Sequence, residues 1–281
     1  MPSIPDLQKI ATQVRRDVIR MTNIAASGHP GGSLGCADFL TVLYFSVMKP
    51  DAEKFSMDGY GEDIFFLSNG HISPAWYSVL ARYGFFGIRE LGSFRRINSR
   101  LQGHPTPHDG LPGIRMSSGS LGQGISVAIG TSLAKKLNND PHLVYCLTGD
   151  GELQEGQNWE AMMFAAAHNV DNLITVADYN GKQIDGPVDK VLSLGNLKGK
   201  IEAFGWKVLE MNGNDIPDVI NVMDMAKSET GKGKPIMIIM RTHMGFGVDF
   251  MLDNHEWHGV APNDAQAALV LAQLAETLGD Y

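Results

Sequence analysis

Two polar side chains with metal-binding chemistry follow two consecutive apolar segments of the sequence. Asp150 lies in the stretch TGDGE, and Asn180 lies in the stretch DYNGK. Carboxylate and amide oxygens are hard donors of the kind that octahedral Mg²⁺ takes, together with a backbone carbonyl and phosphate oxygens. Gly151 would let the backbone approach a diphosphate closely, and the helix predicted to follow it would direct its positive end to the same place. A GDG sequence alone is more often a turn, but its position relative to Asn180 favours a site for a metal and a diphosphate.

A second group of candidates consists of histidines next to glycines. His29, His71 and His104 each follow a glycine, and His258 precedes one. Imidazole is the side chain best suited to move protons near pH 7. A single loop histidine is more often a surface residue or a satisfied hydrogen-bond donor, so the residues alone leave both interpretations open. His255 is undecided. The other histidines considered, His108, His142, His168 and His243, are interpreted as structural.

Common glycine signatures do not indicate another kind of site. The sequence has neither the G-x-G-x-x-G of nicotinamide sites nor the G-x-x-x-x-G-K-[ST] of a P-loop. The pattern G-x-S-x-G does occur, with Ser33 between Gly31 and Gly35. A nucleophile elbow needs a strand before it, whereas the preceding segment has a helical pattern. We therefore predict a loop that allows close approach of the backbone.

The elements that must position these residues alternate between short apolar runs and helical patterns. The predicted strands, each followed by a polar loop with glycine, are Ile64–Leu67, Leu143–Leu147, Leu173–Ala177, Trp206–Met211 and Ile236–Met240. The predicted helices include Leu121–Leu137, Trp159–Ala167 and Leu197–Phe204. This alternation predicts an α/β fold with a doubly wound, mainly parallel sheet and helices on both faces. Ligands of such sheets bind beyond the carboxyl ends of the strands, where Asp150 and Asn180 are expected to meet.

Helical patterns are also predicted near both ends of the sequence, over Leu7–Ala26 and Asn263–Leu278. Charges interrupt the apolar residues of the first pattern, so it does not resemble a secretory signal. No 18-residue window is free of charged and strongly polar residues, which argues against a membrane span. We expect a protein that does not associate with membranes.

Composition supports one globular domain over residues 1–281. The sequence is 43% hydrophobic and 19% charged, and single α/β domains of this length are common. The net charge of −8, without a basic stripe, argues against binding nucleic acid. Cys36 and Cys146 stand apart, so neither a disulfide framework nor a four-ligand zinc site is expected. Both cysteines suit the reducing cytoplasm.

Six ordered blocks of the sequence resemble those of the transketolase family. They are SGHPGGSLG, LSNGHISPA, QGHPTPHDGLPG, SSGSLGQGIS, the pair GDGELQEGQNWEA and DYNGKQIDG, and EWHGVAPN. The GDG block with DYNG resembles the family's thiamine-diphosphate motif. The blocks span nearly the whole chain, and their combination is more specific than any one of them. The resemblance implies the diphosphate-binding domain of a thiamine-diphosphate-binding fold, with the pyrimidine-binding and C-terminal domains absent from this chain.

The resemblance also implies roles for individual residues. The metal ligands would be Asp150, Asn180 and the backbone carbonyl of Lys182, and the metal would be Mg²⁺, for which Ca²⁺ could substitute. The catalytic histidines around the reacting sugar carbons would be His29, His104 and His258. The residues that contact the cofactor would be His71, Gly119, Ser120, Leu121, Gly151, Glu155, Asn180 and His258. Leu121 would pack beside the cofactor rings, and Glu155 would point toward a partner.

The activity that the resemblance implies is transfer of a two-carbon glycolaldehyde unit from a ketose phosphate to an aldose phosphate, as in the pentose phosphate pathway. This chain would act only with a C-terminal transketolase subunit that carries the pyrimidine-binding domain, in an α2β2 assembly. The exposed loops GGSLG and GSLGQG are expected to form the interface. Two alternatives stay open: an enzyme for sulfonated or branched sugars, and a non-catalytic partner subunit that binds the cofactor.

Overall fold

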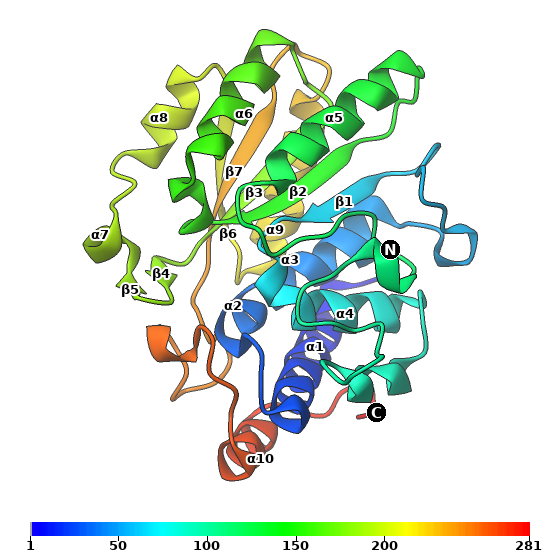
Figure 1. Ribbon diagram of the computed structural model, residues 1–281, viewed down its shortest axis with the longest axis vertical. Coiled ribbons are helices and arrows are strands. Elements are labelled where there is room, and N and C mark those ends of the chain that lie inside the picture. Colours follow the sequence, from blue (N-terminus) through cyan, green and yellow to red (C-terminus); the bar gives the residue numbers. More distant parts are fainter. Residues whose placement is uncertain (1) are drawn as a thin grey trace.

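The computed structural model describes residues 2–281, and its centre is a five-stranded parallel sheet (Figure 1). Across the sheet the strands are β1 (Ile64–Leu67), β2 (Val144–Gly149), β3 (Leu173–Tyr179), β7 (Ile236–Arg241) and β6 (Lys207–Asn212). A small antiparallel pair, β4 (Lys182–Gln183) and β5 (Gly186–Pro187), follows β3. Because the five strands run in one direction, the loops at their carboxyl ends gather along one edge.

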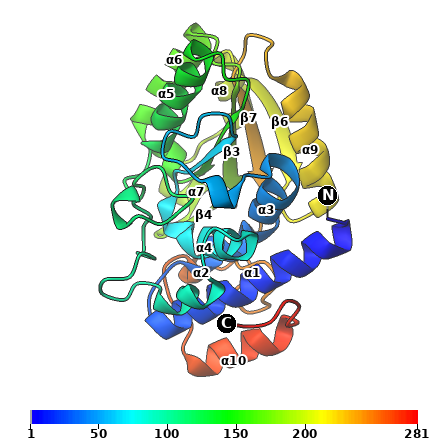
Figure 2. The ribbon, with the colours of Figure 1, turned by 90° about the vertical axis from the view of Figure 1, so that its right-hand side faces the viewer.

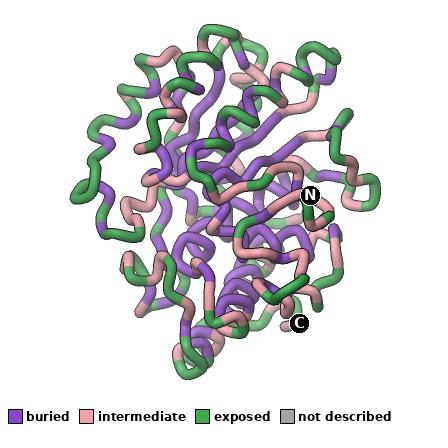
Figure 3. The backbone as a smooth tube through the Cα atoms, in the orientation of Figure 1, coloured by how far each residue is buried: buried purple, intermediate pink, exposed green. Residues whose placement is uncertain are grey.

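Helices pack on both faces of the sheet (Figures 1 and 2). One face is covered by α5 (Gly124–Leu137), α6 (Gly156–Ala167) and α8 (Leu197–Ala203). The other core contains α1 (Ile4–Ala25), α3 (Ala37–Val42), α4 (Ser73–Tyr83) and α9 (Ile216–Glu229). Successive residues of a strand face opposite sides. Accordingly Phe65 packs in the core with α1, and Phe66 packs in the core with α5. Buried backbone runs through both layers (Figure 3).

Shorter elements connect these layers. The α-helices among them are α2 (Pro30–Gly35), α7 (Val188–Val191) and α10 (Asp264–Gln273). A π-helical segment, η1 (Leu43–Met48), follows α3. The 3₁₀ segments are η2 (Ala52–Lys54), η3 (Gly70–Ile72), η4 (Ile88–Ser93), η5 (Pro107–Asp109), η6 (Glu152–Gln154) and η7 (His255–Trp257).

The predicted fold class is confirmed, with differences at the boundaries of individual elements. All five predicted strands are present, and they pair in parallel. The first residue of α5 is Gly124 rather than Leu121, and that of α6 is Gly156 rather than Trp159. The sequence interpretation does not identify α4, whose residues are buried on almost every side. A helix of this kind lacks a clear alternation of polar and apolar faces.

The prediction that the stretch GGSLG is an exposed loop is wrong. It forms the short helix α2, which is buried throughout. A Cβ atom added to Gly31 would lie 2.8 Å from the backbone oxygen of Trp257, so this position has no space for a side chain. The Ser33 hydroxyl donates a hydrogen bond to the His29 carbonyl oxygen at 2.7 Å and has no exposed surface. These residues are part of the core, which is incompatible with a nucleophile elbow or a free interface loop.

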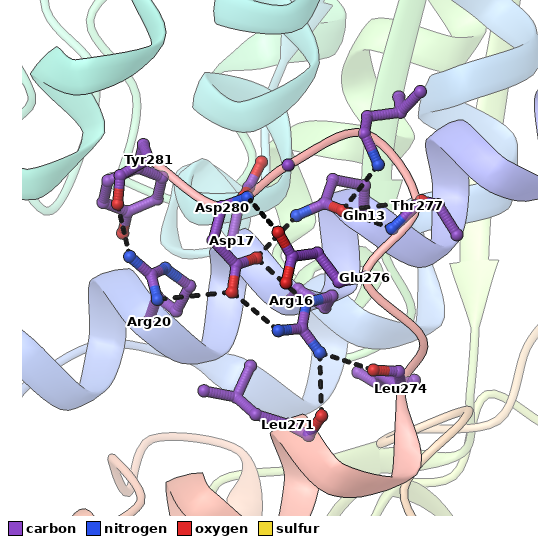
Figure 4. Close-up of polar contacts among 12 residues, drawn as sticks. Gln13, Arg16, Asp17, Arg20, Leu271, Leu274, Glu276, Thr277, Asp280 and Tyr281 are labelled. Atoms are coloured by element: carbon purple, nitrogen blue, oxygen red, sulfur yellow. Dashed lines mark hydrogen bonds and ion pairs between the residues drawn. The ribbon is translucent and has the colours of Figure 1, made fainter.

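The terminal helix is shorter than the predicted range Asn263–Leu278. It ends at Gln273, and Leu274 is its C-cap. The Arg16 guanidinium of α1 donates hydrogen bonds to the carbonyl oxygens of Leu271 and Leu274, which lie at this helix end (Figure 4). A side chain from another element thus satisfies carbonyls that lack partners within the helix.

Residues 274–281, the C-terminal tail, fold back along α1 (Figure 4). The Gln13 side-chain oxygen accepts the backbone N–H groups of Thr277 and Leu278, at 2.9 and 3.0 Å. Asp280 pairs with Arg16 at 2.6 Å and accepts a hydrogen bond from the Gln13 amide at 2.8 Å. The tail therefore joins α10 to α1 through buried and half-buried polar contacts.

Among the helices of residues 2–281, none combines the length and the apolar character that crossing a membrane requires.

Candidate functional site

The loops at the carboxyl edge of the sheet enclose a pocket of about 390 Å³. The predicted site residues that line it are His29, His71, His104, Gly119, Leu121, Asp150, Gly151, Glu155, Asn180, Lys182 and His258. Ser120 is exposed and does not line the pocket. Segments from the N-terminal helices to the loop before α10 thus meet in one place, as the position of the polar loops predicts.

The predicted metal ligands lie together at one end of this pocket. The Asp150 carboxylate accepts the backbone N–H groups of Gly151, at 2.7 Å, and Gly181, at 2.6 Å. The Asn180 side-chain oxygen accepts the backbone N–H of Lys182 at 2.9 Å. These contacts hold the turn between β3 and β4 against the GDG turn, so the two oxygen donors face the same cavity.

A second acid is buried behind Asp150. The register of the sheet places Gly149 opposite Asp178. The Asp178 carboxylate accepts hydrogen bonds from the Thr242 hydroxyl and from the Asn180 amide, the latter at 2.9 Å. Burial, with the nearby charge of Asp178, raises the pKa of Asp150 to about 7, and burial raises the pKa of Asp178 as well. Two acids buried together are stabilised by a bound cation.

Protein groups alone do not complete a metal centre. Within residues 2–281, no group of three or more His, Cys, Asp and Glu side chains is arranged to hold a metal ion. The set formed by Asp150, Asn180 and the Lys182 carbonyl has one carboxylate and otherwise neutral oxygens. Mg²⁺ commonly combines such a set with phosphate oxygens and water. The donors therefore fit a metal that is shared between the protein and a diphosphate.

Four histidine rings form another wall of the pocket. The ring centroid of His29 lies 5.1 Å from that of His71, 6.3 Å from that of His104 and 5.7 Å from that of His258. Burial, with nearby positive groups, lowers the pKa of His29 to about 4, and burial also lowers the pKa values of the other three. All four rings are therefore neutral at pH 7. The Nδ1 atoms of His29 and His258 are buried without a hydrogen-bond partner within residues 2–281.

Glu152 is a pocket residue that the sequence interpretation does not identify. Its carboxylate accepts hydrogen bonds from the Ser68 hydroxyl, from the Gly122 N–H at 2.8 Å and from the Gly149 N–H at 3.0 Å. Burial raises its pKa despite these donors. One side chain thus ties three loops of the pocket together. The available signal was an acid inside the GDGE turn, where two glycines leave little else to fix the loop.

Leu121, predicted to pack beside the cofactor rings, and Glu155, predicted to point toward a partner, lie at the rim of the pocket. Leu121 is 37% exposed, and Glu155 is also exposed. Leu121 of GSLGQG is thus exposed, unlike the buried GGSLG, and a role of this loop in an interface stays a prediction. An apolar side chain and a carboxylate therefore stand at the mouth of the pocket.

The remaining histidines lie outside the pocket. Each histidine interpreted as structural has a local contact or is exposed: His142 with Asp140 at 2.6 Å, His168 with the Phe164 ring at a centroid distance of 4.1 Å, His243 with Asp253 at 3.0 Å, and exposed His108. His255 is the first residue of η7 and does not line the pocket.

Comparison with known proteins agrees with this architecture. Residues 7–277 match the family model described as the thiamine diphosphate binding domain of transketolase. An apulose-4-phosphate transketolase subunit from Actinobacillus succinogenes is 36% identical over 275 residues, which cover 98% of both chains. The 6-deoxy-6-sulfo-D-fructose transketolase subunit SqwG of Clostridium sp. is 39% identical over 246 residues, or 87% of each chain. The crystal structure of Campylobacter jejuni transketolase superposes with a TM-score of 0.88 and 33% identity, over 97% of this chain and 43% of that one.

The fold and these matches define a thiamine-diphosphate-binding α/β protein. The chain belongs to the transketolase family and corresponds to its thiamine-diphosphate-binding domain. It spans about two fifths of the solved transketolases but nearly the full length of relatives that are named as transketolase subunits.

Proposed function

We propose that this chain is the N-terminal subunit of a split, thiamine-diphosphate-dependent transketolase. In this proposal it moves a two-carbon glycolaldehyde unit from a ketose phosphate to an aldose phosphate. The observation that carries the proposal is the shared pocket, in which hard oxygen donors lie at one end and four neutral imidazoles form another wall.

One end of the pocket would bind the metal and the diphosphate. Asp150, Asn180 and the Lys182 carbonyl would hold Mg²⁺, or Ca²⁺ in its place, against the diphosphate. Gly151 and His71 would contact the diphosphate, while Leu121, at the rim, would pack beside the cofactor rings with Gly119, Ser120 and Glu155 nearby. Thiamine diphosphate would supply the nucleophilic carbon and the electron sink for cleaving the sugar.

The histidine wall would handle the protons of the sugar. A neutral imidazole can accept a proton from a sugar hydroxyl and return it later, so lowered pKa values suit His29, His104 and His258 to this role. His255, which the sequence leaves undecided, has no catalytic role in this proposal, because it does not line the pocket.

A second chain is needed to complete the site. We propose that residues 1–281 form one diphosphate-binding domain and that a partner chain supplies the pyrimidine-binding domain. Relatives of the same length that are named as transketolase subunits support a division of this kind. Exposed apolar side chains on α5 and α6, among them Val127, Met163 and Phe164, offer a surface for an α2β2 assembly. Cys36 and Cys146 are buried free thiols, which is compatible with a cytoplasmic enzyme.

A modified sugar is the second candidate substrate. Two relatives are named for apulose 4-phosphate and for 6-deoxy-6-sulfo-D-fructose. Both remain transketolases by name, so this alternative changes the sugar and keeps the two-carbon transfer. A non-catalytic role is less well supported, because a chain without a reaction to catalyse has no use for four imidazoles around one cavity.

The test is reconstitution of activity. This chain would be purified alone and with the product of a neighbouring gene that encodes a pyrimidine-binding half. Transfer from a ketose phosphate would be assayed with thiamine diphosphate and Mg²⁺. We expect no turnover by the lone chain and turnover by the complex.

In the complex, His104→Ala should lower the rate about 10²- to 10⁴-fold, as expected for loss of a general acid or base, while cofactor affinity changes little. Turnover by the lone chain would contradict the split site, and an unaffected His104→Ala complex would remove His104 from the reaction.

A further inference from the structure

Glu152 lies where three loops of the pocket meet, and it is 2% exposed. One carboxylate oxygen, Oε1, accepts hydrogen bonds from the Ser68 hydroxyl and, at 2.8 Å, from the Gly122 N–H. The other oxygen, Oε2, accepts the Gly149 N–H at 3.0 Å. The Ser68 hydroxyl oxygen in turn accepts, at 3.0 Å, the N–H of Gly124, the first residue of α5. A single buried side chain therefore connects the ends of β1 and β2 with the start of α5.

Only a group that accepts hydrogen bonds at both of its polar atoms fits this position. The three partners of Glu152 are all donors, one O–H and two N–H groups. None of the ion pairs within residues 2–281 includes Glu152, so these donors and the positive N-terminal end of α5 balance its charge. A glutamine has the same size, but its amide nitrogen would face a donor and leave a buried N–H without an acceptor. The surroundings therefore select a carboxylate.

Glu152 connects two parts of the pocket that are held in different ways. At the metal-binding end, Asp150 accepts two backbone N–H groups, and its neighbour Gly149 belongs to the sheet. At the rim, residues 119–123, the rim loop, form neither a helix nor a strand. Glu152 and the amide of Gln157 hold the rim loop through hydrogen bonds, and of these two side chains only Glu152 is buried. The metal-binding end is thus fixed by its own contacts, whereas the rim loop depends on Glu152.

We propose that Glu152 is a positioning residue for thiamine diphosphate, which sets the distance between the rim loop and the GDG turn so that the rings and the diphosphate fit together. This inference rests on the proposed function, in which the metal-binding end holds the diphosphate and the rim lies beside the rings. A ligand that spans both ends binds more tightly when their spacing is already fixed, because less conformational freedom is lost on binding. Inorganic diphosphate would occupy only the metal-binding end, so its binding should depend much less on Glu152.

The first test compares thiamine diphosphate with inorganic diphosphate. Calorimetry would measure the affinity of each ligand for the complex with the partner, in the presence of Mg²⁺ and without sugar. We expect Glu152→Gln to weaken binding of thiamine diphosphate about 10- to 100-fold, the effect of a buried donor left without an acceptor, and binding of diphosphate less than about 3-fold. Glu202→Gln is the control, because it removes an exposed acid of α8 and should change neither affinity. Equal losses for the two ligands, or no loss for either, would overturn the proposal.

The comparison also separates positioning from charge. Removal of a negative charge beside the pocket would by itself strengthen the binding of both anionic ligands. A loss confined to thiamine diphosphate therefore has to come from the position of the rim loop. Because no sugar is present, this result is independent of whether the complex transfers a two-carbon unit, so the proposed reaction can fail while the positioning role stands.

Ser68→Ala tests the same role with a milder change. It keeps the carboxylate and removes the hydroxyl that lies between Glu152 and Gly124. We expect a loss of about 3- to 10-fold for thiamine diphosphate and no change for diphosphate, since one hydrogen bond is lost. Urea unfolding of each variant would measure stability separately, and Ser68→Ala would decide alone if Glu152→Gln does not fold. A Ser68→Ala chain that loses stability but keeps its affinity for thiamine diphosphate would contradict the positioning role.

Discussion

At the scale of single residues, the pairing of Asp150 with Asp178 is the feature that most needs a ligand. Burial and the Asp178 charge act together against ionisation of Asp150, although two backbone N–H groups stabilise its carboxylate. A stable protein gains little from such an arrangement unless a cation balances it. The geometry is thus better explained by binding than by folding.

Asp150→Asn tests this explanation. The variant keeps the shape of the side chain and removes the charge that attracts the metal, so we expect thiamine diphosphate with Mg²⁺ to bind at least about 30-fold more weakly, which is about 2 kcal/mol. Calorimetric titration of the complex with its partner would measure this affinity. Asp185→Asn is the control, because Asp185 is an exposed acid between β4 and β5. Unchanged affinity in a folded Asp150→Asn complex would exclude Asp150 as a ligand.

The sequence predicts a site residue well where that residue lies in a recognisable local motif. Asp150 and Asn180 follow consecutive strands, and the histidines adjoin glycines, so their loops could be identified without coordinates. Glu152 is different, because what distinguishes it is its surroundings. It accepts hydrogen bonds from loops distant in sequence. This property is not visible in a linear pattern.

At the scale of elements, too, the sequence predicts a helix or strand where neighbouring residues determine it, and not where contacts with distant residues do. The strands were predictable because each is a short apolar run that ends in a polar loop. The segment GGSLG looks like a flexible loop by composition, yet it is a buried helix because Met244 and Trp257 pack directly against Gly31. The end of α10 was not predictable, because Arg16, more than 250 positions earlier, satisfies its last carbonyls.

The C-terminal tail gives a prediction about stability and pH. The hydrogen-bonded pair with Arg16 is the main cause that lowers the pKa of Asp280 to about 2, from an ordinary value of 3.8. A lowered pKa means that the ionised form stabilises the folded state. This contribution is fully present above about pH 4 and is lost as the pH falls toward 2. Since the side chain is partly exposed, we expect Asp280→Asn to lower the free energy of unfolding by about 1–2 kcal/mol at pH 7.

Urea unfolding of the chain at pH 7 and near pH 2.5 would measure this contribution. The difference between Asp280→Asn and the parent should shrink at the lower pH, where the parent carboxylate is also becoming protonated. Glu202→Gln is the control, since Glu202 is an exposed acid of α8 that forms no ion pair within the part of the chain described. A difference that stays constant with pH would show that lost packing, rather than charge, is responsible.

At the scale of the whole molecule, the exposed face of α5 and α6 is the feature without an explanation inside the chain. The two helices lie side by side on one face of the sheet (Figure 1). Met163 is 55% exposed, Phe164 47% and Val127 39%. Leu121, at the pocket rim, lies just before the first residue of α5. Contiguous apolar patches on a protein surface generally mark an interface.

Phe164→Glu tests whether this face holds the enzyme together. A charge placed in a desolvated contact costs several kcal/mol, so we expect the complex with the partner to dissociate at micromolar concentration and to lose transfer activity with it. Sedimentation of the mixture would show the change from two copies of each chain to smaller species. Leu269→Glu provides the control, because Leu269 is a 59% exposed residue of α10, away from these helices. If Phe164→Glu sediments and reacts like the parent, the partner must cover a different face, and the exposed side chains of α5 and α6 would have no role in assembly.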